Sequence, residues 1–434
     1  MESSAATNRK VARRSALAAT IGNVLEWYDF IMFGFMSVLI ARQFFPAGDP
    51  YTSLLLVTAT TGAGLVFRPI GGILIGMYAD RAGRRQALSL VMLLMTLSTL
   101  LLVFTPSYSR IGIAATAIVV LARILQAISA GGEFGAATSM LVEYAPAHRK
   151  NFYGSWQMFA QSAGGLLSAC MGALLTNVFT PQEVDAWAWR IPFCLGLLIG
   201  PVGLYMRRAV VETHAFEAVA DTGTTSLRTV LAQHRQSVVV ATALSGALNV
   251  MTYAVIIYLP IYAVENLGLP ASVPFTVLVV ALALRMAIIP LAGHWADRVG
   301  GAALLKGSLI AFLIVLYPCF YWVIHSPGLV SLMASEAIFA VLIGLFMGPM
   351  STFAAVLFPV NVRSTGLSLA YNIGASLIGG ITPVFLTWVL HVSGDRFSLA
   401  HYCAFFFVLG LAGLARLNRR GIGQPDVPRL IKPE

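Results

Sequence analysis

Long apolar runs alternate with short polar segments along the whole chain. Twelve of these runs have about 20 residues or more, the length of helix that crosses the roughly 30 Å hydrocarbon layer of a bilayer. The pattern predicts an all-α membrane protein with twelve transmembrane helices. We expect them at residues 15–40, 54–78, 86–106, 111–143, 152–178 and 188–206 in the first half, and at 237–264, 272–296, 302–325, 330–358, 363–390 and 397–416 in the second.

A polar turn between two apolar runs occurs twice. The segment from Gly76 to Arg85 returns in weaker form from Gly293 to Gly300, 217 residues later in a chain of 434 residues. A shift of half the chain indicates two similar halves in tandem. We therefore expect two six-helix bundles related by a pseudo-two-fold axis, the design of carriers that rock around a central site. The predicted parts are residues 1–206, a cytoplasmic linker at 207–236, and residues 237–434 with a short cytoplasmic tail.

The composition also points to the membrane. Hydrophobic residues make up 58% of the chain and charged residues 11%, whereas soluble domains have roughly 45–50% and 25%. A soluble globular protein could not bury that much apolar surface. The first apolar run follows four basic residues but is too long for a cleavable signal peptide and lacks a cleavage site of small residues. We expect it to remain as the first membrane helix.

Basic residues fall in alternate loops. Under the positive-inside rule, the loops that carry them face the cytoplasm. This predicts cytoplasmic termini and a place in the inner membrane of a bacterium, and it accounts for most of the net charge of +10 without nucleic acid as a partner. The residues are Arg9, Lys10, Arg13, Arg14, Arg81, Arg84, Arg85, Arg149, Lys150, Arg207, Arg208, Arg228, Arg235, Arg298, Lys306, Arg363 and those of the C-terminal tail.

The sequence has no pattern typical of metal, cofactor or covalent chemistry. Its four cysteines are scattered singly within apolar runs, at Cys170, Cys194, Cys319 and Cys403. It has no phosphate-binding loop, no Gly-x-Ser-x-Gly and no zinc-type His/Glu pattern. We therefore expect no enzymatic activity, no cofactor and no metal.

Several stretches resemble one family of membrane carriers. The first turn matches the signature G-x-x-x-D-R-x-G-R-[RK], which lies between helices 2 and 3 of the major facilitator superfamily and is predicted to form its cytoplasmic gate. Residues 22–30, 68–72, 123–126, 131–135 and 189–193 are similar to its metabolite:proton symporter branch, which includes permeases for citrate, 2-oxoglutarate, shikimate and proline/betaine. Residues 368–370 and 379–383 look most like the citrate permeases. The gate residues are Gly76, Asp80, Arg81, Gly83, Arg84 and Arg85.

This resemblance implies uptake of a small organic molecule together with protons, by alternating access, in a protein that acts as a monomer. The chain departs from the family pattern in two places. The second turn reads Val299-Gly300-Gly301-Ala302 where the family usually repeats G-R-R, so the latch of the second half should be the weaker one. Arg285 lies in helix 8 at a commonly uncharged position, and Arg68 is its repeat partner. The two arginines could bind a substrate with several carboxylates or could belong to a structural network near the cytoplasmic loops. For Arg68 we favour the structural role.

Ionisable residues inside membrane helices are functional candidates because each costs roughly 2.5–3.5 kcal/mol to insert. The guanidinium of Arg123 can bind a carboxylate through two parallel hydrogen bonds, so we expect it to bind the substrate anion. The alternative is an ion pair with Asp29 or Glu133 that holds helices 1 and 4 together. The full set is Glu26, Asp29, Arg68, Arg123, Glu133, Arg285 and Glu336.

The carboxyl groups of the first half are candidates for proton coupling. Glu26 and Asp29 are three residues apart and project from nearly one face of their helix. A carboxyl that is shielded from water takes up a proton more readily, and an approaching arginine reverses this preference. We expect Asp29, Glu133 and Glu26 to include the proton site. The alternative for Glu26 is a pair with a base on the cytoplasmic side.

Neutral polar side chains complete the predicted substrate cavity. Because a lone amide in a membrane helix is often a packing hydrogen bond, packing is the alternative for each of them. We expect substrate contacts from Tyr28, Gln126, Gln157, Gln161, Asn249, Tyr253 and Asn372, beside Arg123 and Arg285; further candidates are Asn23, Tyr258, Tyr371 and Ser376.

These features favour proton-driven uptake of an organic anion, above all a di- or tricarboxylate such as citrate. A zwitterion such as proline or betaine is the alternative substrate. A non-transporting membrane receptor or a channel is the alternative class, but the two repeats with their turn motif favour rocking around a central site over an open pore.

Overall fold

The computed structural model describes residues 2–46, 50–209, 212–217, 227–270 and 272–418, and all regular structure in them is helical. Residues 210–211 and 218–226 of the predicted linker and residues 419–434 of the predicted tail lie outside the described residues. The N-terminal half contains α1 (Glu2–Phe35), α2 (Ser37–Phe44), α3 (Pro50–Ala82), α4 (Arg84–Phe104), α5 (Tyr108–Ile111), α6 (Ile113–Tyr144), α7 (Lys150–Val178), α8 (Pro181–Glu183), α9 (Arg190–Gly196) and α10 (Ile199–Ala209).

The C-terminal half contains α13 (Arg235–Met251), α14 (Leu259–Glu265), α15 (Ser272–Val299), α16 (Gly301–His325), α17 (Leu329–Val356), α18 (Arg363–Asn372), α19 (Thr382–Ser393) and α20 (Ser398–Asn418). Two short helices, α11 (His214–Glu217) and α12 (Leu227–Gln233), lie between the halves in sequence.

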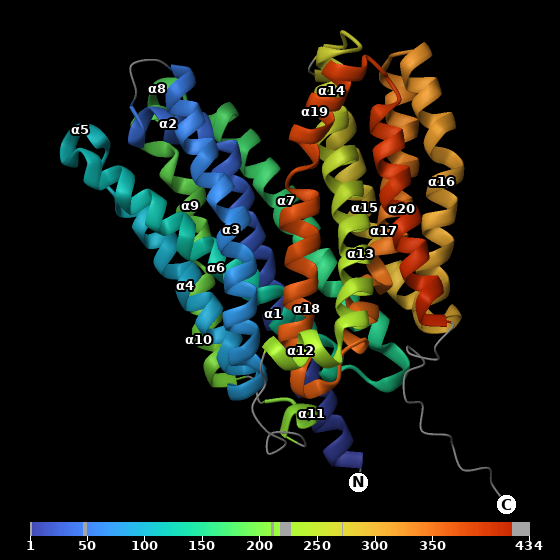
Figure 1. The fold of residues 1–434 in the computed structure, drawn as a ribbon. Coiled ribbons are helices and arrows are strands. Elements are labelled where there is room, and N and C mark those ends of the chain that lie inside the picture. Colours follow the sequence, from blue (N-terminus) through green and yellow to red (C-terminus); the bar gives the residue numbers. More distant parts are fainter. Residues whose placement is uncertain (1, 47–49, 210–211, 218–226, 271, 419–434) are drawn as a thin grey trace, which may run out of the picture.

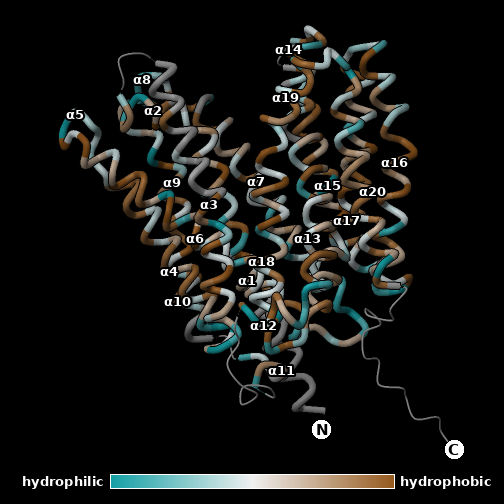
Figure 2. The backbone as a smooth tube through the Cα atoms, viewed as in Figure 1, coloured by the Kyte–Doolittle hydropathy of each residue, from teal (hydrophilic) through white to brown (hydrophobic). Residues whose placement is uncertain are grey.

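The helices have the length and character of membrane spans. Among the described residues, nine helical segments are long and apolar enough to cross a bilayer, and the bent pair Pro181–Ala188 and Arg190–Tyr205 makes a tenth. α1 and α3, with 34 and 33 residues, complete the predicted set of twelve. Figure 2 shows that hydrophobic residues cover much of the length of the helices. Large apolar side chains such as Ile113 and Val384 expose 73% and 72% of their surface, as expected where hydrocarbon replaces water.

The two halves meet at one end of the molecule. Figure 1 shows that they lie close together near α11 and α12 and diverge toward the opposite end. We call the end with α11 and α12 the latch end. The largest cluster of buried apolar side chains centres on the C-terminal half and takes in Phe134, Val142 and Met158 of the N-terminal half. The halves therefore share part of their packing.

The hydrophobic pattern did not predict the three π-helical turns of the described residues, of which η2 (Val184–Ala188) follows α8 and the other two lie in the C-terminal half. Instead of one continuous helix at 363–390, the structure has α18, the π turn η5 (Ile373–Gly379) and α19. A second π turn, η3 (Thr252–Tyr258), follows α13. A side chain at Gly379 would meet the Cβ of Asn249 at 2.5 Å, so the missing side chain lets these two irregular helices touch. Such turns occur frequently at functional sites.

Candidate functional site

The first turn motif joins the two halves at the latch end. Asp80, at the end of α3, accepts hydrogen bonds from the backbone N–H groups of Ser364 (3.0 Å) and Thr365 (2.8 Å) and from the Thr365 hydroxyl (2.7 Å). These N–H groups belong to the first turn of α18, where helical N–H groups have no partner within the helix. A carboxylate is stabilised there by the helix dipole. Asp80 thus binds one half of the protein to the other.

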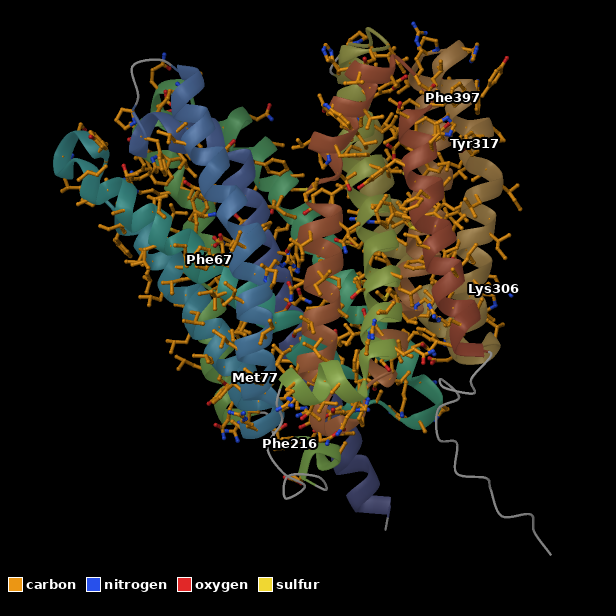
Figure 3. The ribbon with its side chains drawn as sticks, in the orientation of Figure 1. Phe67, Met77, Phe216, Lys306, Tyr317 and Phe397 are labelled. Carbon is orange, nitrogen blue, oxygen red and sulfur yellow. The ribbon has the colours of Figure 1, made fainter. Side chains whose placement is uncertain are left out.

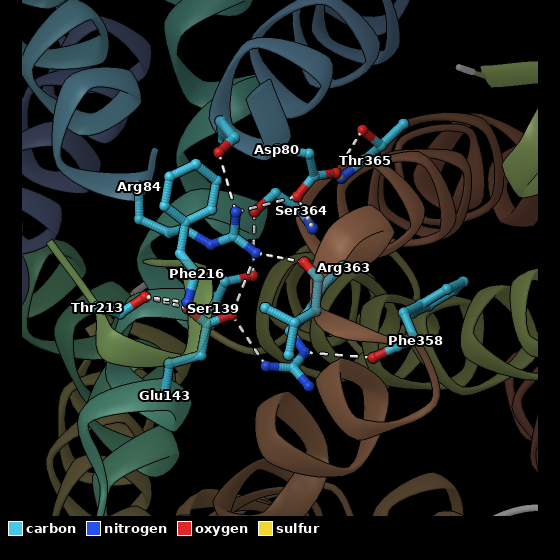
Figure 4. A network of polar contacts seen from close by, with 12 residues as sticks. Asp80, Arg84, Ser139, Glu143, Thr213, Phe216, Phe358, Arg363, Ser364 and Thr365 are labelled. Carbon is cyan, nitrogen blue, oxygen red and sulfur yellow. Dashed lines mark hydrogen bonds and ion pairs between the residues drawn. The ribbon is translucent and has the colours of Figure 1, made fainter. Parts of the chain in front are cut away.

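An ion-pair network surrounds this contact (Figure 4). Arg84 is fully buried and pairs with Asp80 (3.4 Å) and with Glu143 of α6 (3.2 Å). Glu143 also pairs with Arg363 of α18 at 2.9 Å, so it connects an arginine from each half. Arg84 also donates to the Val360 carbonyl (2.5 Å). Removing one member would strand a buried charge, so the network is stable only as a unit.

α11 and the two residues before it cover this network. The Thr213 hydroxyl donates to Glu143 at 2.6 Å, and Glu212 accepts the backbone N–H of Arg85 at 3.0 Å. The ring of Phe216 lies 4.9 Å from the Arg84 guanidinium, which is a cation–π contact. Figure 3 shows Phe216 at the latch end of the bundle. The start of the predicted linker is therefore part of the latch.

Gly83 has its place in the motif for a steric reason. Its φ is +103°, which side chains rarely adopt. A side chain there would also collide with the Glu212 carboxylate. Gly76 faces α18, and a Cβ atom would meet the Cα of Thr365 at 2.8 Å. Arg81 is exposed, and Arg85 contacts Glu212 through its backbone.

The second turn motif makes a related but smaller contact. Asp297, at the end of α15, accepts the backbone N–H groups of Asn151 (2.8 Å) and Phe152 (3.0 Å) at the start of α7. Each aspartate therefore binds the first turn of a helix in the other half. None of the ion pairs of the described residues includes Asp297. The second latch has fewer contacts than the first.

Asp80→Asn is expected to loosen the latch end more than Asp297→Asn. Asparagine keeps one acceptor for α18 but loses the charge that Arg84 and the helix N-terminus stabilise, a cost of roughly 1.5–3 kcal/mol for a hydrogen bond to a charged group. Spin labels on exposed Gln86 and Ala303 would report the separation of the halves by pulsed electron resonance. Equal widening in the two variants would contradict this ranking.

Inside the membrane, Asp29 and Arg123 belong to one polar cluster of the N-terminal half. Asp29 accepts hydrogen bonds from the Thr99 hydroxyl (3.0 Å) and the Gln126 amide (2.7 Å). Gln126 in turn accepts a hydrogen bond from the Arg123 guanidinium. Arg123 is thus connected to Asp29 through Gln126. Arg123 and Gln126 lie on α6, which packs beside α1 with Asp29 and α4 with Thr99. The predicted grouping of Arg123, Gln126 and Asp29 is present in the structure.

Arg123 also packs on aromatic rings. Its guanidinium carbon is 3.9 Å from the ring centre of Phe33 and 5.1 Å from that of Phe30. On α3, the guanidinium carbon of Arg68 lies 6.0 Å from the same Phe30 ring. The two arginines therefore flank one aromatic side chain. This places two cations in one region of the N-terminal half.

Arg68 faces the boundary between the halves. Besides Phe30, its guanidinium lies 5.2 Å from the ring centre of Trp27 and 5.9 Å from that of Tyr371 on α18. Its charge acts on Glu26 and on Glu133, and these two carboxylates also act on each other. Arg68 thus lies among these aromatic rings and carboxylates, apart from the ion-pair network at the latch end, and not in the structural network near the cytoplasmic loops that we favoured for it.

Tyr371 connects this cluster to the C-terminal half. Its ring stacks on Phe134 with the ring centres 3.5 Å apart, and its hydroxyl exchanges hydrogen bonds with the Gln161 amide at 3.3–3.4 Å. Asn372 donates to the Gly131 carbonyl (2.8 Å) across the boundary. Gln161 and Asn372 therefore lie where the halves meet, at the level of the membrane cluster.

The remaining predicted substrate residues have partners within the protein, and Gln157 among them belongs to the cluster of Glu133. Tyr28 is fully buried and donates to the Pro192 carbonyl at 2.9 Å, which turns it into the core of the N-terminal half. Gln157 donates to Glu133 at 3.4 Å. Asn249 donates to the Ser245 carbonyl of its own helix at 2.8 Å. Tyr253 packs against Gly379.

Arg285 is not joined to Arg123 by any contact among the described residues. It lies on α15 within the C-terminal half, where Glu336 is the charged group that acts on it. Whether Arg68 and Arg285 bind one substrate from the two halves therefore stays a prediction. The second cation near Arg123 is Arg68.

Sequence reasoning missed Glu143 and Thr213. Glu143 is the last residue of the predicted span at 111–143. The sequence does give one indication for Glu143: it is an acidic residue where a membrane helix meets a loop that carries Arg149 and Lys150. Thr213 carries no such signal.

Among the described residues, no group of three or more His, Cys, Asp or Glu side chains could hold a metal ion.

Comparison with known proteins gives matches over nearly the whole chain. A family model described as the Major Facilitator Superfamily matches residues 19–383. The citrate-proton symporter of Salmonella typhi is 33% identical over 413 residues, covering 95% of each chain. The proline/betaine transporter of Salmonella typhimurium is 31% identical over 411 residues, covering 92% of this chain and 82% of the relative. A solved proton:xylose symporter bound to 6-bromo-6-deoxy-D-glucose matches with a TM-score of 0.77 at 18% identity, covering 95% of this chain and 96% of that chain.

Proposed function

The chain belongs to the Major Facilitator Superfamily, and we propose that it takes up a small organic anion, most of all a di- or tricarboxylate such as citrate, together with protons. It is a multi-pass membrane transporter and not an enzyme. We further propose that the latch end faces the cytoplasm of a bacterial cell, that both termini lie on that side of the inner membrane, and that the protein acts as a monomer.

The observation that carries the substrate proposal is the pair of arginines around Phe30. Arg123 and Arg68 lie 5.1 and 6.0 Å from its ring centre. A guanidinium binds a carboxylate through two parallel hydrogen bonds, so two of them suit a substrate with two or more carboxylates. The Nε atoms of both arginines are buried without a hydrogen-bond partner, which leaves donors for an anion.

The same arrangement supports a route for coupling to protons. In the structure, Arg123 reaches Asp29 through Gln126, and the charge of Arg68 acts on Glu26 and Glu133. A substrate anion that binds the arginines would compete with these carboxylates, so their charged form would lose the stabilisation that the arginines provide. A proton on a carboxylate then restores the balance of charge, so anion and proton enter together. Release of both on the other side completes the cycle.

The closed latch end supports an outward-facing state. The polar contacts that Asp80, Arg363 and Asp297 make between the halves lie at that end. With the latch end in the cytoplasm, the site would open to the outside first. Inward release would then require these contacts to break.

One observation favours a zwitterion as the second candidate. Trp27, Phe30 and Tyr371 surround a cation, here the Arg68 guanidinium. Aromatic side chains in such an arrangement also bind quaternary ammonium groups. The ammonium group of betaine would have to displace the Arg68 guanidinium from these rings, whereas a carboxylate of a polycarboxylate would bind to that guanidinium.

A thermal-shift screen of the purified protein separates the two candidates. A ligand at about 100 times its Kd stabilises the folded state by about 2.7 kcal/mol. We expect citrate to raise the melting temperature, and Arg68→Gln to reduce the rise much more than Arg285→Gln. Stabilisation by betaine or proline and not by di- or tricarboxylates would refute the anion proposal.

A further inference from the structure

Two opposite charges are buried in the C-terminal half without direct contact. Arg285 lies midway along α15 and exposes 6% of its surface, and Glu336 lies on α17 and exposes 2%. The Nε and Nη1 atoms of Arg285 and the Oε2 atom of Glu336 are buried without a hydrogen-bond partner. Each is nevertheless the charged group that acts on the other. The helices that carry them pack directly, since a side chain at Gly344 of α17 would lie 3.4 Å from the carbonyl oxygen of Arg285 on α15, yet the two charged groups form no ion pair among the described residues.

The neighbours of this pair are neutral. The Ser335 hydroxyl beside Glu336 has no hydrogen-bond partner, and Cys319 of α16 lies near Ser335. Apart from Arg285, no described charged group acts on Glu336. A change in the charge of Glu336 would therefore mainly change the electrostatic interaction with Arg285.

An unpaired buried charge is unstable, and this pair can relieve the cost in two ways. The guanidinium and carboxylate can close into a hydrogen-bonded ion pair, or the carboxylate can take up a proton and stay apart from the arginine. The two arrangements differ in charge and in the spacing of α15 and α17. A movement of these helices would therefore change whether Glu336 holds a proton.

The rocking of the halves supplies such a movement. α15 and α17 both meet α7 of the N-terminal half: a side chain at Gly293 would lie 2.7 Å from the Ser155 hydroxyl, and Thr352 donates to the Lys150 carbonyl at 2.9 Å. Opening of the latch end would remove these contacts from both helices that carry the charged pair.

The N-terminal half has a similar arrangement. There, Arg68 on α3 acts on Glu133 on α6. These are the second and fourth long helices of that half, as α15 and α17 are of the other. Both halves thus place an arginine on the second helix and a glutamate on the fourth.

We infer that Glu336 is a second proton-binding carboxyl of the transport cycle, paired with Arg285 when charged and separated from it when protonated. The inference rests on the proposed proton-coupled transport. With Glu336, each transport cycle carries one proton more than the N-terminal cluster alone would carry.

Infrared difference spectroscopy tests proton binding without a substrate. The protein would be placed in phosphatidylethanolamine/phosphatidylglycerol vesicles and compared in acidic and alkaline buffer. We expect a carboxylic-acid band that Glu336→Gln removes and that Glu183→Gln, a change of an exposed carboxyl at the end of α8, leaves in place. Persistence of every such band in Glu336→Gln would overturn the inference.

The proton-to-citrate ratio tests its role in transport. The ratio follows from the citrate gradient that balances an imposed pH gradient in proteoliposomes. The double variant Arg285→Gln/Glu336→Gln avoids a stranded charge, so it should fold, and it should carry one proton fewer per citrate. An unchanged ratio would refute the role of Glu336. If the unmodified protein carries no citrate, the proposed substrate is wrong, and the infrared result still decides whether Glu336 binds a proton.

Discussion

Arg123→Ala is expected to weaken the binding of a carboxylate substrate by about 2–5 kcal/mol, the cost of leaving a buried charge without its partner. This corresponds to roughly a thirtyfold to several-thousandfold rise in Kd. The reason is the position of Arg123: it lies against Phe30 and Phe33, and its hydrogen-bonded link to Asp29 runs through Gln126. Calorimetric titration with citrate would measure the change.

Two further variants separate geometry from charge. Arg123→Lys keeps the charge but loses the planar arrangement of donors, so its Kd should lie between those of the wild type and of Arg123→Ala. Arg42→Ala removes an arginine whose side chain is 64% exposed and pairs with Asp185. It should leave Kd unchanged. Unchanged affinity in a folded Arg123→Ala protein would assign Arg123 to helix packing.

Replacing a coupling carboxylate by its amide is expected to abolish accumulation while exchange of internal for external substrate continues. The amide imitates the protonated carboxyl and cannot release a proton. Asp29→Asn, Glu133→Gln and Glu26→Gln are the variants to compare. In Asp29→Asn, an amide oxygen still accepts from Thr99 or Gln126, so the local structure should be kept.

The readout is radiolabelled citrate in proteoliposomes under an imposed pH gradient, beside counterflow without a gradient. Asp185→Asn serves as the control, because Asp185 is a half-exposed acid that pairs with Arg42 of α2. It should accumulate substrate normally. If all three carboxylate variants still accumulate citrate in response to the gradient, the N-terminal cluster is not the coupling site.

The predicted helices and turn motifs agree with the structure for a physical reason. In hydrocarbon, every backbone polar group must find its partner within the helix, so each span is a continuous apolar run that can be read from the chain. The turn motif is equally direct, because Asp80 and Arg84 are charges at the end of an apolar helix. Their partners Ser364 and Glu143 are distant in sequence and could not be assigned.

The direction of side chains was harder to predict. Spacing along a helix tells which residues share a face but not which neighbouring helix that face meets. Glu26 and Asp29 project from nearly one face, and Asp29 is among the charges that act on Glu26; their other partners differ, because Asp29 contacts Thr99 and Gln126 while Glu26 also feels the charge of Arg68. Tyr28, next to Asp29, turns toward Pro192. These differences depend on how the helices are rotated in the bundle.

Arg68 and Arg285 illustrate the same limit. Their separation of 217 residues indicated equivalent places in the two halves. The equivalence holds for the helices, but Arg68 lies among aromatic rings at the boundary, and Arg285 lies beside Glu336 inside its own half. The two environments differ because Trp27, Phe30 and Tyr371 surround Arg68, whereas none of the described cation–π contacts includes Arg285.

Proton-driven uptake of citrate by the purified, reconstituted protein is the most direct test of the proposed function. Proteoliposomes would be loaded with alkaline buffer and diluted into acidic buffer that contains radiolabelled citrate. Each proton that moves down a gradient of one pH unit releases about 1.4 kcal/mol, enough for about tenfold accumulation. We expect citrate to accumulate against its gradient and to leave again when a protonophore is added. Citrate uptake that is the same with and without the pH gradient would contradict proton-coupled symport.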